Sequence, residues 1–355
     1  MFAAVRAIEY YLPAKTLSNE ELVKEFPGWT AEKIRVKTGI ESRHLAGESQ
    51  WASDMAVEAG RKLFHGGSCT AADIDFVLLC TQSPDYLLPT TACLVQQRLG
   101  ISTDAGAWDM NLGCSGYVYG LSAAKGLIET GQARNVLLLT CETYSKFMDP
   151  RDFNVRTIFG DAASATLVRV EANTSDEGGA WIGPFVFGSD GSGAENLIFR
   201  RGGARHAAYK PPSAHGTTPS EDVHDPTALY MNGPEIFTFT LRTVPDCVGR
   251  LLQKAGVSLD EVDLFVFHQA NKFMLEHLRK KMQIPEEKFV YAMSDCGNTT
   301  SSTIPIALRR MSLERPPRQG ARILLVGFGV GYSWAAALMR WHGGKGVDCP
   351  ASQDS

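Results

Sequence analysis

The sequence repeats part of its own pattern, and this repeat constrains the fold more than any other feature. Three pairs of short apolar segments match in the same order along the chain. The pairs are 70–83 with 258–271 and 134–140 with 322–328, both at an offset of 188 residues, and 164–170 with 335–341 after a shift of 17 residues. Short apolar strands also recur by coincidence in α/β proteins, but three ordered matches indicate two related halves.

Apolar runs and segments with a helical period alternate along the chain. The runs at 76–80, 135–141, 264–268 and 323–329 are short and rich in Val, Leu and Phe, which is typical of buried strands. The run FVYAM at 289–293 is also expected to be a strand. Helical periodicity predicts helices over 52–66, 115–130, 235–255, 271–283 and 302–312. The alternation predicts an α/β fold.

The repeat suggests boundaries for the two halves. We expect the first half over residues 1–175 and the second over 233–342. Residues 176–232 are rich in Gly, Pro, Ser and His and show little periodicity, so a connection and surface lid are expected there. Residues 343–355 have no apolar periodicity and are expected to form a flexible tail.

Composition disfavours several classes of protein. The 355 residues, 44% of them hydrophobic, suffice for one large core or two smaller ones. A formal net charge of -4 offers no basic face for nucleic acid. No apolar run reaches the roughly 18 residues of a membrane span, and no signal peptide is visible, so a cytoplasmic protein is expected. The eight dispersed cysteines form no CxxC pair, so neither a metal site nor disulfides are expected.

Cys114 lies where a strand-like run gives way to a helix of small residues. A thiol at a helix N-terminus meets the positive end of the helix dipole, which favours the thiolate and predicts a nucleophile. Gly113 and Gly116 are expected to leave room for an acyl group. The alternative, a buried structural cysteine, is expected for those in apolar runs: Cys80, Cys93, Cys141 and Cys247.

His268 and Asn298 are the other candidates for chemistry. His268 ends an apolar run and would project from the carboxyl edge of a sheet, where α/β folds bind ligands. Its ordinary pKa suits proton transfer, although a hydrogen-bonded core histidine is the alternative. Asn298 precedes a predicted helix, a place where asparagine is a common turn residue. The offset of 188 carries Cys114 to residue 302, close to Asn298, so a pseudo-twofold arrangement would bring the three side chains to one cleft.

A glycine-rich segment at 327–334, GFGVGYSW, follows an apolar run but lacks the spacing of a dinucleotide-binding or phosphate-binding loop. A close approach of backbones is the simpler interpretation. A backbone N–H of this segment, paired with that of Cys114, would form the oxyanion hole that acyl transfer requires.

At these residues the sequence resembles the β-ketoacyl-acyl-carrier-protein synthase III family of thiolase-fold condensing enzymes, over nearly the whole chain to about Trp341. The motifs are VKTGIESRH (36–44), DMNLGCSG (109–116), IFGDAASATLV (158–168), HQAN (268–271), GNTTSSTIP (297–305) and GFGVGYSW (327–334). The resemblance implies an α/β, thiolase-like fold of two pseudo-symmetric halves in α-β-α-β-α layers. It also implies a homodimer, in which Leu88 reaches toward the partner's acyl pocket.

The resemblance implies a two-step reaction without a permanently bound cofactor. Cys114 would take an acyl group from a thioester, usually acyl-coenzyme A. Malonyl-acyl carrier protein would then be decarboxylated and its carbanion would attack the acyl group, as in fatty-acid biosynthesis. His268 and Asn298 would stabilise the enolate oxygen, and neutral His268 could also assist deprotonation of the thiol. The N–H groups of Cys114 and Val330 would form the oxyanion hole.

Two surfaces bear on the substrates. Typical members stack the adenine of coenzyme A between a tryptophan and an arginine, where this chain has Lys33 and Phe153. Trp29 and Arg151 lie nearby and could compensate through a shifted loop, or the donor is not coenzyme A. A landing for the acidic carrier protein, or merely a solvated helix face, is offered by Lys272, Arg279, Lys280 and Lys281.

Three other functions stay open from sequence alone. An enzyme of the same fold can pass the acyl group to a hydroxyl or amine, although the presence of His268 with Asn298 favours decarboxylation. Head-to-head joining of two fatty acyl chains would need a glutamate base that the sequence does not expose. A non-catalytic heterodimer partner is disfavoured by the intact set of three residues. Acyl chain length depends on side chains within 84–91 and 185–232 and is not defined by the sequence.

Overall fold

Strands from both parts of the chain build one mixed sheet in this computed structural model, which describes residues 1–171, 180–205, 225 and 227–341. Within these residues the sheet has nine strands in the order β11-β12-β13-β8-β1-β7-β6-β4-β5. The strands are β1 (Phe2–Tyr11), β4 (Phe76–Cys80), β5 (Gly106–Met110), β6 (Asn135–Glu142), β7 (Ala162–Glu171), β8 (Ala180–Ser189), β11 (Leu264–Phe267), β12 (Ala321–Gly329) and β13 (Ser333–Trp341). Four of them, β4, β6, β11 and β12, confirm the strands predicted from apolar runs.

The strand order is symmetric about the seam between β1 and β8. On one side β4 pairs with β6 in parallel, and β6, β7 and β1 follow with antiparallel pairing. On the other side β11, β12, β13 and β8 repeat this pattern. At the seam only Ala4 with Trp181 and Val5 with Ala180 are paired. The two related halves indicated by the repeat are therefore present, with β5 added at one edge.

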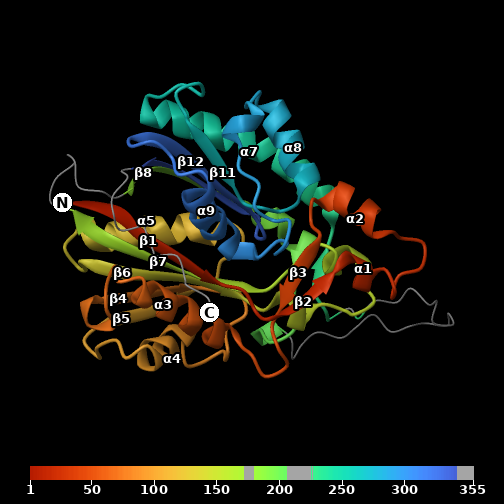
Figure 1. Cartoon of the computed structure of the whole chain (residues 1–355), viewed down its shortest axis with the longest axis horizontal. Helices are drawn as coiled ribbons and strands as arrows, with labels where there is room; N and C mark the ends of the chain where they lie inside the picture. The colour runs from red at the N-terminus through yellow and green to blue at the C-terminus, as the bar shows by residue number, and fades with distance from the viewer. Residues whose placement is uncertain (172–179, 206–224, 226, 342–355) are drawn as a thin grey trace.

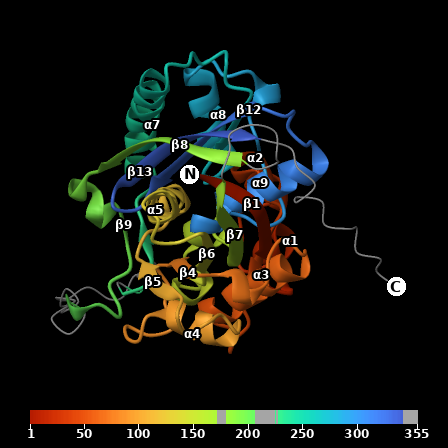
Figure 2. The ribbon, with the colours of Figure 1, turned by 90° about the vertical axis from the view of Figure 1, so that its left-hand side faces the viewer.

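Helices lie in three layers around the two halves of the sheet. Figures 1 and 2 show α5 (Gly116–Glu129) and α9 (Thr303–Glu314) between the halves, α3 (Ala52–His65) and α4 (Thr91–Arg98) on one outer face, and α7 (Gly233–Ala255) and α8 (Lys272–Lys281) on the other. The α-β-α-β-α arrangement is confirmed. The five longer helices agree with their predicted ranges to within a few residues.

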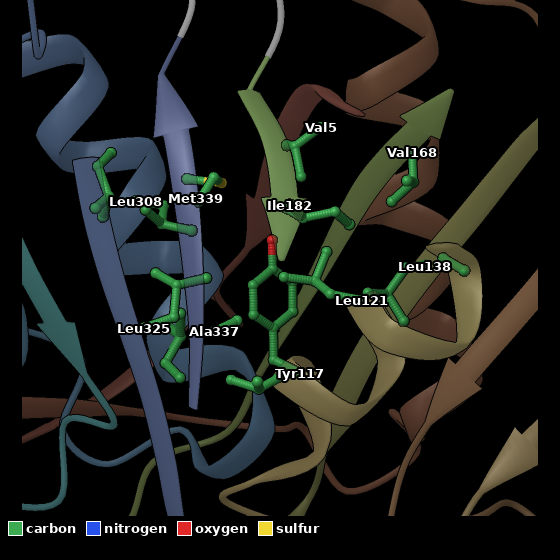
Figure 3. Packing of buried hydrophobic residues seen from close by; sticks show 14 of the residues in the cluster. Val5, Tyr117, Leu121, Leu138, Val168, Ile182, Leu308, Leu325, Ala337 and Met339 are labelled. Atoms are coloured by element: carbon green, nitrogen blue, oxygen red, sulfur yellow. The ribbon is translucent and has the colours of Figure 1, made fainter. Parts of the chain in front are cut away.

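Strand residues alternate between the middle and outer layers. In β6, Leu138 packs with the middle cluster, whereas Leu137 and Leu139 pack with the outer cluster around α3. In β12, Leu325 faces the middle cluster and Leu324 faces the cluster around α7. Figure 3 shows Leu138 and Leu325 on opposite sides of α5. Because both faces of these strands are buried, the strands are apolar throughout.

The repeat holds with a correction of one residue. Leu78 of β4 and Val266 of β11 are 188 residues apart and both face the middle layer. Their neighbours across the strands are Leu138 and Leu325, which are 187 residues apart. The offset of 188 is therefore wrong by one for β6 and β12, and a shift of one residue turns a strand side chain to the opposite face. The sequence could not show this, because both faces are apolar.

Two predictions about elements are wrong. Residues 289–293 form no strand, and only Phe289 makes an isolated bridge, to Phe265. The segment 176–232 is more than a connection and lid, since it contains the inner strand β8 and the short pair β9 (Leu197–Ile198) and β10 (Tyr230–Met231). Its residues 206–224, and the expected tail 343–355, lie outside the described residues. The boundaries of the halves at 175 and 233 remain predictions.

No helix in the described part of the chain is both long enough and apolar enough to cross a membrane.

Candidate active site

Cys114, His268 and Asn298 line one cavity of ≈ 710 Å³. Cys114 lies just before α5, His268 directly follows β11, and Asn298 precedes the short 3-10 turn Thr300–Ser302 that leads into α9. The cavity therefore collects residues from both halves, next to the two helices of the middle layer. The three side chains that the sequence analysis selected do come together.

Strand β12 passes directly against Cys114. A Cβ atom at Gly329 would lie 2.7 Å from both Cβ and Sγ of Cys114, and one at Gly327 would lie 2.7 Å from Cα of Ser115. No side chain fits at either position, so this is the close backbone approach that the glycine-rich segment suggested. The two halves are in backbone contact at the thiol.

The other two glycines beside Cys114 do not leave room for an acyl group, so that expectation is wrong. A Cβ atom at Gly113 would lie 2.5 Å from Oε1 of Gln82 and 2.8 Å from Cγ1 of Val330. A Cβ atom at Gly116 would collide with Sγ of Cys80. The space is taken by other side chains of the protein.

The thiol of Cys114 is buried, at 4% exposure, and is protonated at neutral pH. Burial raises its pKa to about 12, although N–H groups of Val330 and of Cys114 itself favour the thiolate. The backbone N–H groups at the start of the helix do favour the thiolate, as expected, but desolvation of the charge outweighs them. A base is needed when the thiol reacts. The backbone N–H groups of Val330 and Cys114 both lie within hydrogen-bond reach of the sulfur.

His268 is buried and neutral. Its Nδ1 lies 2.8 Å from Oγ1 of Thr303, and its backbone N–H donates to the carbonyl of Val326 at 2.8 Å. Burial lowers the pKa of His268 to about 3, so the imidazole carries no charge at neutral pH. A neutral imidazole can either accept a proton or donate a hydrogen bond.

Asn298 lines the cavity and is held by hydrogen bonds to its Oδ1 and to its backbone. Its Oδ1 accepts from the backbone N–H of Thr300 at 2.9 Å, and its own backbone N–H donates to Ile158 at 2.8 Å. The amide nitrogen makes no hydrogen bond to the described residues. Since Asn298 lines the cavity, this donor is available to a ligand oxygen.

A buried carboxyl close to the site, Glu142, was not found from the sequence. It accepts from the backbone N–H of Gln82 at 3.0 Å, from Oγ of Ser83 at 2.9 Å and from Oγ of Ser301 at 3.4 Å. Burial raises its pKa to about 8. A charged residue directly after the apolar run NVLLLTC was the available signal. Glu142 joins the end of β4 to the segment between Asn298 and α9.

Two of the four residues proposed for donor binding line the cavity. Trp29 stacks on Phe153 with ring centroids 4.3 Å apart, and Lys37 lies 5.8 Å from the tryptophan ring. Lys33 and Arg151 do not line the cavity. Arg151 is paired with Asp149 at 2.8 Å. The aromatic rings are in contact with each other, so an adenine would have to separate them.

The expected carrier-protein surface on α8 is largely paired with the protein itself. Arg279 and Lys280 contact Glu276 at 2.9 and 3.7 Å, and Nζ of Lys281 donates to the carbonyl of Leu241. Lys272 packs its stem against Gly39. None of the four lines the cavity. Separately, Leu88 is 82% exposed and also lies outside the cavity.

Apolar side chains form most of the remaining cavity wall. They include Phe159, Leu197, Met231, Ile236, Phe237 and Phe328. Leu197 and Met231 come from β9 and β10, so the described part of the 176–232 segment closes the cavity.

Comparison with known proteins agrees with this geometry. The family described as 3-oxoacyl-[acyl-carrier-protein (ACP)] synthase III matches residues 108–191, and its C-terminal counterpart matches 252–341. A β-ketoacyl-[acyl-carrier-protein] synthase III of Clostridium perfringens is 35% identical over 330 residues, covering 93% of this chain and 96% of that protein. One from Caldanaerobacter subterraneus is 34% identical over 332 residues, covering 93% and 95%.

Solved structures show the same likeness. A crystal structure of a 3-oxoacyl-(acyl-carrier-protein) synthase III has 52% identity and a TM-score of 0.89, covering 96% of this chain and 100% of that one. A 3-oxoacyl-(acyl-carrier protein) synthase of Burkholderia xenovorans LB400 has 35% identity and a TM-score of 0.85, covering 98% and 96%.

Proposed function

Since the chain belongs to the 3-oxoacyl-[acyl-carrier-protein] synthase III family and is a condensing acyltransferase of that type, we propose that Cys114, His268 and Asn298 carry its chemistry. The observation that supports this most is the meeting of these three residues in one largely apolar cavity. The apolar wall suits an acyl chain, and the polar groups lie where its thioester would react.

In the first step the thiol of Cys114 attacks the carbonyl of an acyl thioester. Its raised pKa requires a proton acceptor, and neutral His268 supplies one. The backbone N–H groups of Cys114 and Val330 stabilise the oxyanion that forms. The leaving thiol takes the proton, and the acyl group remains on Cys114.

In the second step malonyl-acyl carrier protein loses carbon dioxide, and its carbanion attacks the acyl group. The carbon-sulfur bond to Cys114 then breaks, and the released thiolate takes up a proton. The negative charge that develops on the malonyl thioester oxygen needs donors. The available amide N–H₂ of Asn298 and an N–H of His268 supply them. The mainly apolar wall offers few partners to water, which would otherwise hydrolyse the intermediate.

Acyl-coenzyme A is the proposed donor, with Trp29 and Phe153 at the cavity mouth receiving it. Lys37 lies beside the pair and can neutralise a phosphate. Lys33 and Arg151 are proposed to contribute less to donor binding, because they do not line the cavity. For the carrier protein, the outer face of α8 is the proposed docking surface, where the side chain of Lys280 is 70% exposed.

The assembly is proposed to be a homodimer through the edge strand β5. Trp108 on this strand is 40% exposed, and Leu87 and Leu88 nearby are 78% and 82% exposed. An unpaired edge with apolar side chains is a ready surface for a second copy. Leu88 would then enter the acyl pocket of the partner.

Transfer to a hydroxyl or amine is less well supported. A simple transferase does not need a second donor for an enolate, whereas Asn298 lines the cavity and its amide nitrogen makes no hydrogen bond to the described residues. A non-catalytic heterodimer partner would not need a cysteine packed against Gly327 and Gly329 of the opposite half.

Intact-protein mass spectrometry after incubation with acyl-coenzyme A donors from acetyl to about twelve carbons tests the proposal, beside a Cys114→Ala control. We expect an adduct on the wild type alone that malonyl-acyl carrier protein discharges with release of carbon dioxide. An adduct that malonyl-acyl carrier protein leaves in place would favour the hydroxyl or amine transferase. Absence of any adduct, also with acyl-carrier-protein donors, would refute the proposal.

A further inference from the structure

Thr303, the first residue of α9, contacts His268 and has no part in the chemistry described so far. Its Oγ1 lies 2.8 Å from Nδ1 of His268 and 3.0 Å from the carbonyl oxygen of Thr300, to which it donates. Thr303 and His268 are each 2% exposed. A carbonyl oxygen can only accept, so the Thr300 carbonyl takes the single hydroxyl proton of Thr303, and Oγ1 is left to accept from Nδ1. The same carbonyl also accepts from the imidazole of His268, so both partners of the ring favour an N–H on this side.

We propose that Thr303 is a positioning residue that holds His268 with its proton on Nδ1, which leaves the lone pair of Nε2 to accept the proton of the Cys114 thiol. This inference rests on the proposed function, in which His268 is that acceptor. The neutral imidazole carries one N–H only, so whatever satisfies Nδ1 decides the state of Nε2.

The proton transfers balance through the first step. The thiol proton passes to Nε2 as sulfur bonds to the acyl carbon, and the Nδ1–H bond to Thr303 stabilises the imidazolium. The same proton leaves with the departing thiol when its carbon-sulfur bond breaks. For the second step the imidazole releases the Nδ1 proton to solvent and takes one up on Nε2, with no net change, and Nε2–H then donates to the enolate oxygen. The Thr303 hydroxyl turns from the Thr300 carbonyl and donates to Nδ1, which supports this second form. A valine at position 303 removes the Oγ1 partner in both forms.

The backbone at Thr300 links this contact to Asn298. Thr300 has a φ of 54°, which is rare for a β-branched residue. In this conformation its N–H binds Oδ1 of Asn298 while its carbonyl accepts from Thr303. One residue therefore orients the partners of both polar groups in the cavity.

The chain offers a conservative variant and a matched control. Thr303→Val removes the hydroxyl at nearly constant volume, and Thr303→Ser retains it. Ser302→Ala removes the neighbouring buried hydroxyl, which binds Oγ1 of Thr140 at 2.8 Å and does not contact His268. Melting temperatures show whether the three variants fold equally well.

The tautomer is read by nuclear magnetic resonance of protein labelled with ¹⁵N-histidine, with His268→Gln identifying the signals. We expect protonated Nδ1 in the wild type, Thr303→Ser and Ser302→Ala, and loss of that state in Thr303→Val. Acylation by the donor that labels wild-type Cys114 should slow about ten- to a hundred-fold in Thr303→Val only.

Two results would overturn the inference about Thr303 and leave the proposed role of His268 untouched. They are persistence of protonated Nδ1 in Thr303→Val, and acylation of Thr303→Ser as slow as that of Thr303→Val. Acylation of His268→Gln at the wild-type rate would instead overturn the proposed role of His268 itself, and this inference with it.

Discussion

The protonated state of the Cys114 thiol gives a prediction at the scale of a single residue. Burial raises its pKa to about 12, so the thiolate fraction should increase about tenfold for each pH unit between 7 and 9. The rate of alkylation by iodoacetamide should rise in the same proportion. Cys114→Ala corrects for Cys93, which is exposed and not buried as expected from its apolar run. A plateau below pH 8 would contradict this and indicate a thiolate paired with an imidazolium.

Gly329 gives a second prediction, because its missing side chain is what admits the thiol. Gly329→Ala would place a methyl group 2.7 Å from Sγ of Cys114, so acylation should fall by at least about a hundredfold as the nucleophile is displaced. The matched control is Gly126→Ala, at an exposed position in α5 with open space around it. It should raise the free energy of unfolding by about 0.5–1 kcal/mol and leave acylation unchanged. Acylation of Gly329→Ala at the wild-type rate would disprove the close contact.

At the scale of elements, the sequence predicted what depends on local pattern. Apolar runs located β4, β6, β11 and β12, and helical periodicity located α3 and α5, because burial on both faces or on one stripe determines these patterns. The run FVYAM is equally apolar, yet Phe289 finds no strand partner beyond an isolated bridge. Whether a run pairs depends on distant neighbours, which the local sequence does not contain.

The candidate site was predictable to the same extent. Cys114, His268 and Asn298 lie at the ends of strands or the starts of helices, and the repeat indicated that Cys114 and Asn298 occupy equivalent places in the two halves. The contact of Trp29 with Phe153, the pairing of Arg151 with Asp149, and burial of the thiol depend on tertiary packing. The helix dipole suggested a thiolate because it can be read from sequence, whereas desolvation, the stronger effect, cannot.

Glu142 gives a prediction for the elements it joins. In the folded protein it keeps its proton up to about pH 8, whereas an unfolded glutamate loses it near its ordinary value of 4.5. Protonated Glu142 therefore contributes fully to the free energy of unfolding below about pH 4.5. This contribution is lost as the pH rises to about 8, because the unfolded state is favoured by releasing the proton. Glu142→Gln stays neutral, so the difference between its melting temperature and that of the wild type should shift in favour of the variant as the pH rises from about 4.5 to about 8. Calorimetry from pH 5 to 9 measures it.

The exposed Glu20→Gln is the control for this series and should run parallel to the wild type. A constant difference between Glu142→Gln and wild type at every pH would show that Glu142 is ionised in the folded state.

At the scale of the whole molecule, the β5 edge predicts self-association. Sedimentation should give twice the mass of one chain, and Trp108→Asp should shift it toward the monomer, because a carboxylate would replace an exposed apolar side chain at the edge. Leu88→Ser should remain dimeric and alter the preferred acyl chain length. A monomeric wild type at micromolar concentration would refute the proposed interface.

The glycines at 327 and 329 supply a criterion for reading other sequences of this architecture. Bare backbone of the opposite half lies against the thiol, so in a gene copy with alanine or a larger residue at either position we expect the cysteine to be displaced and acylation to be impaired. Such a copy could persist as an inactive companion of a working one. Residues 327 and 329, far in sequence from the cysteine, therefore predict which copies are active, and an acylation assay can check that prediction.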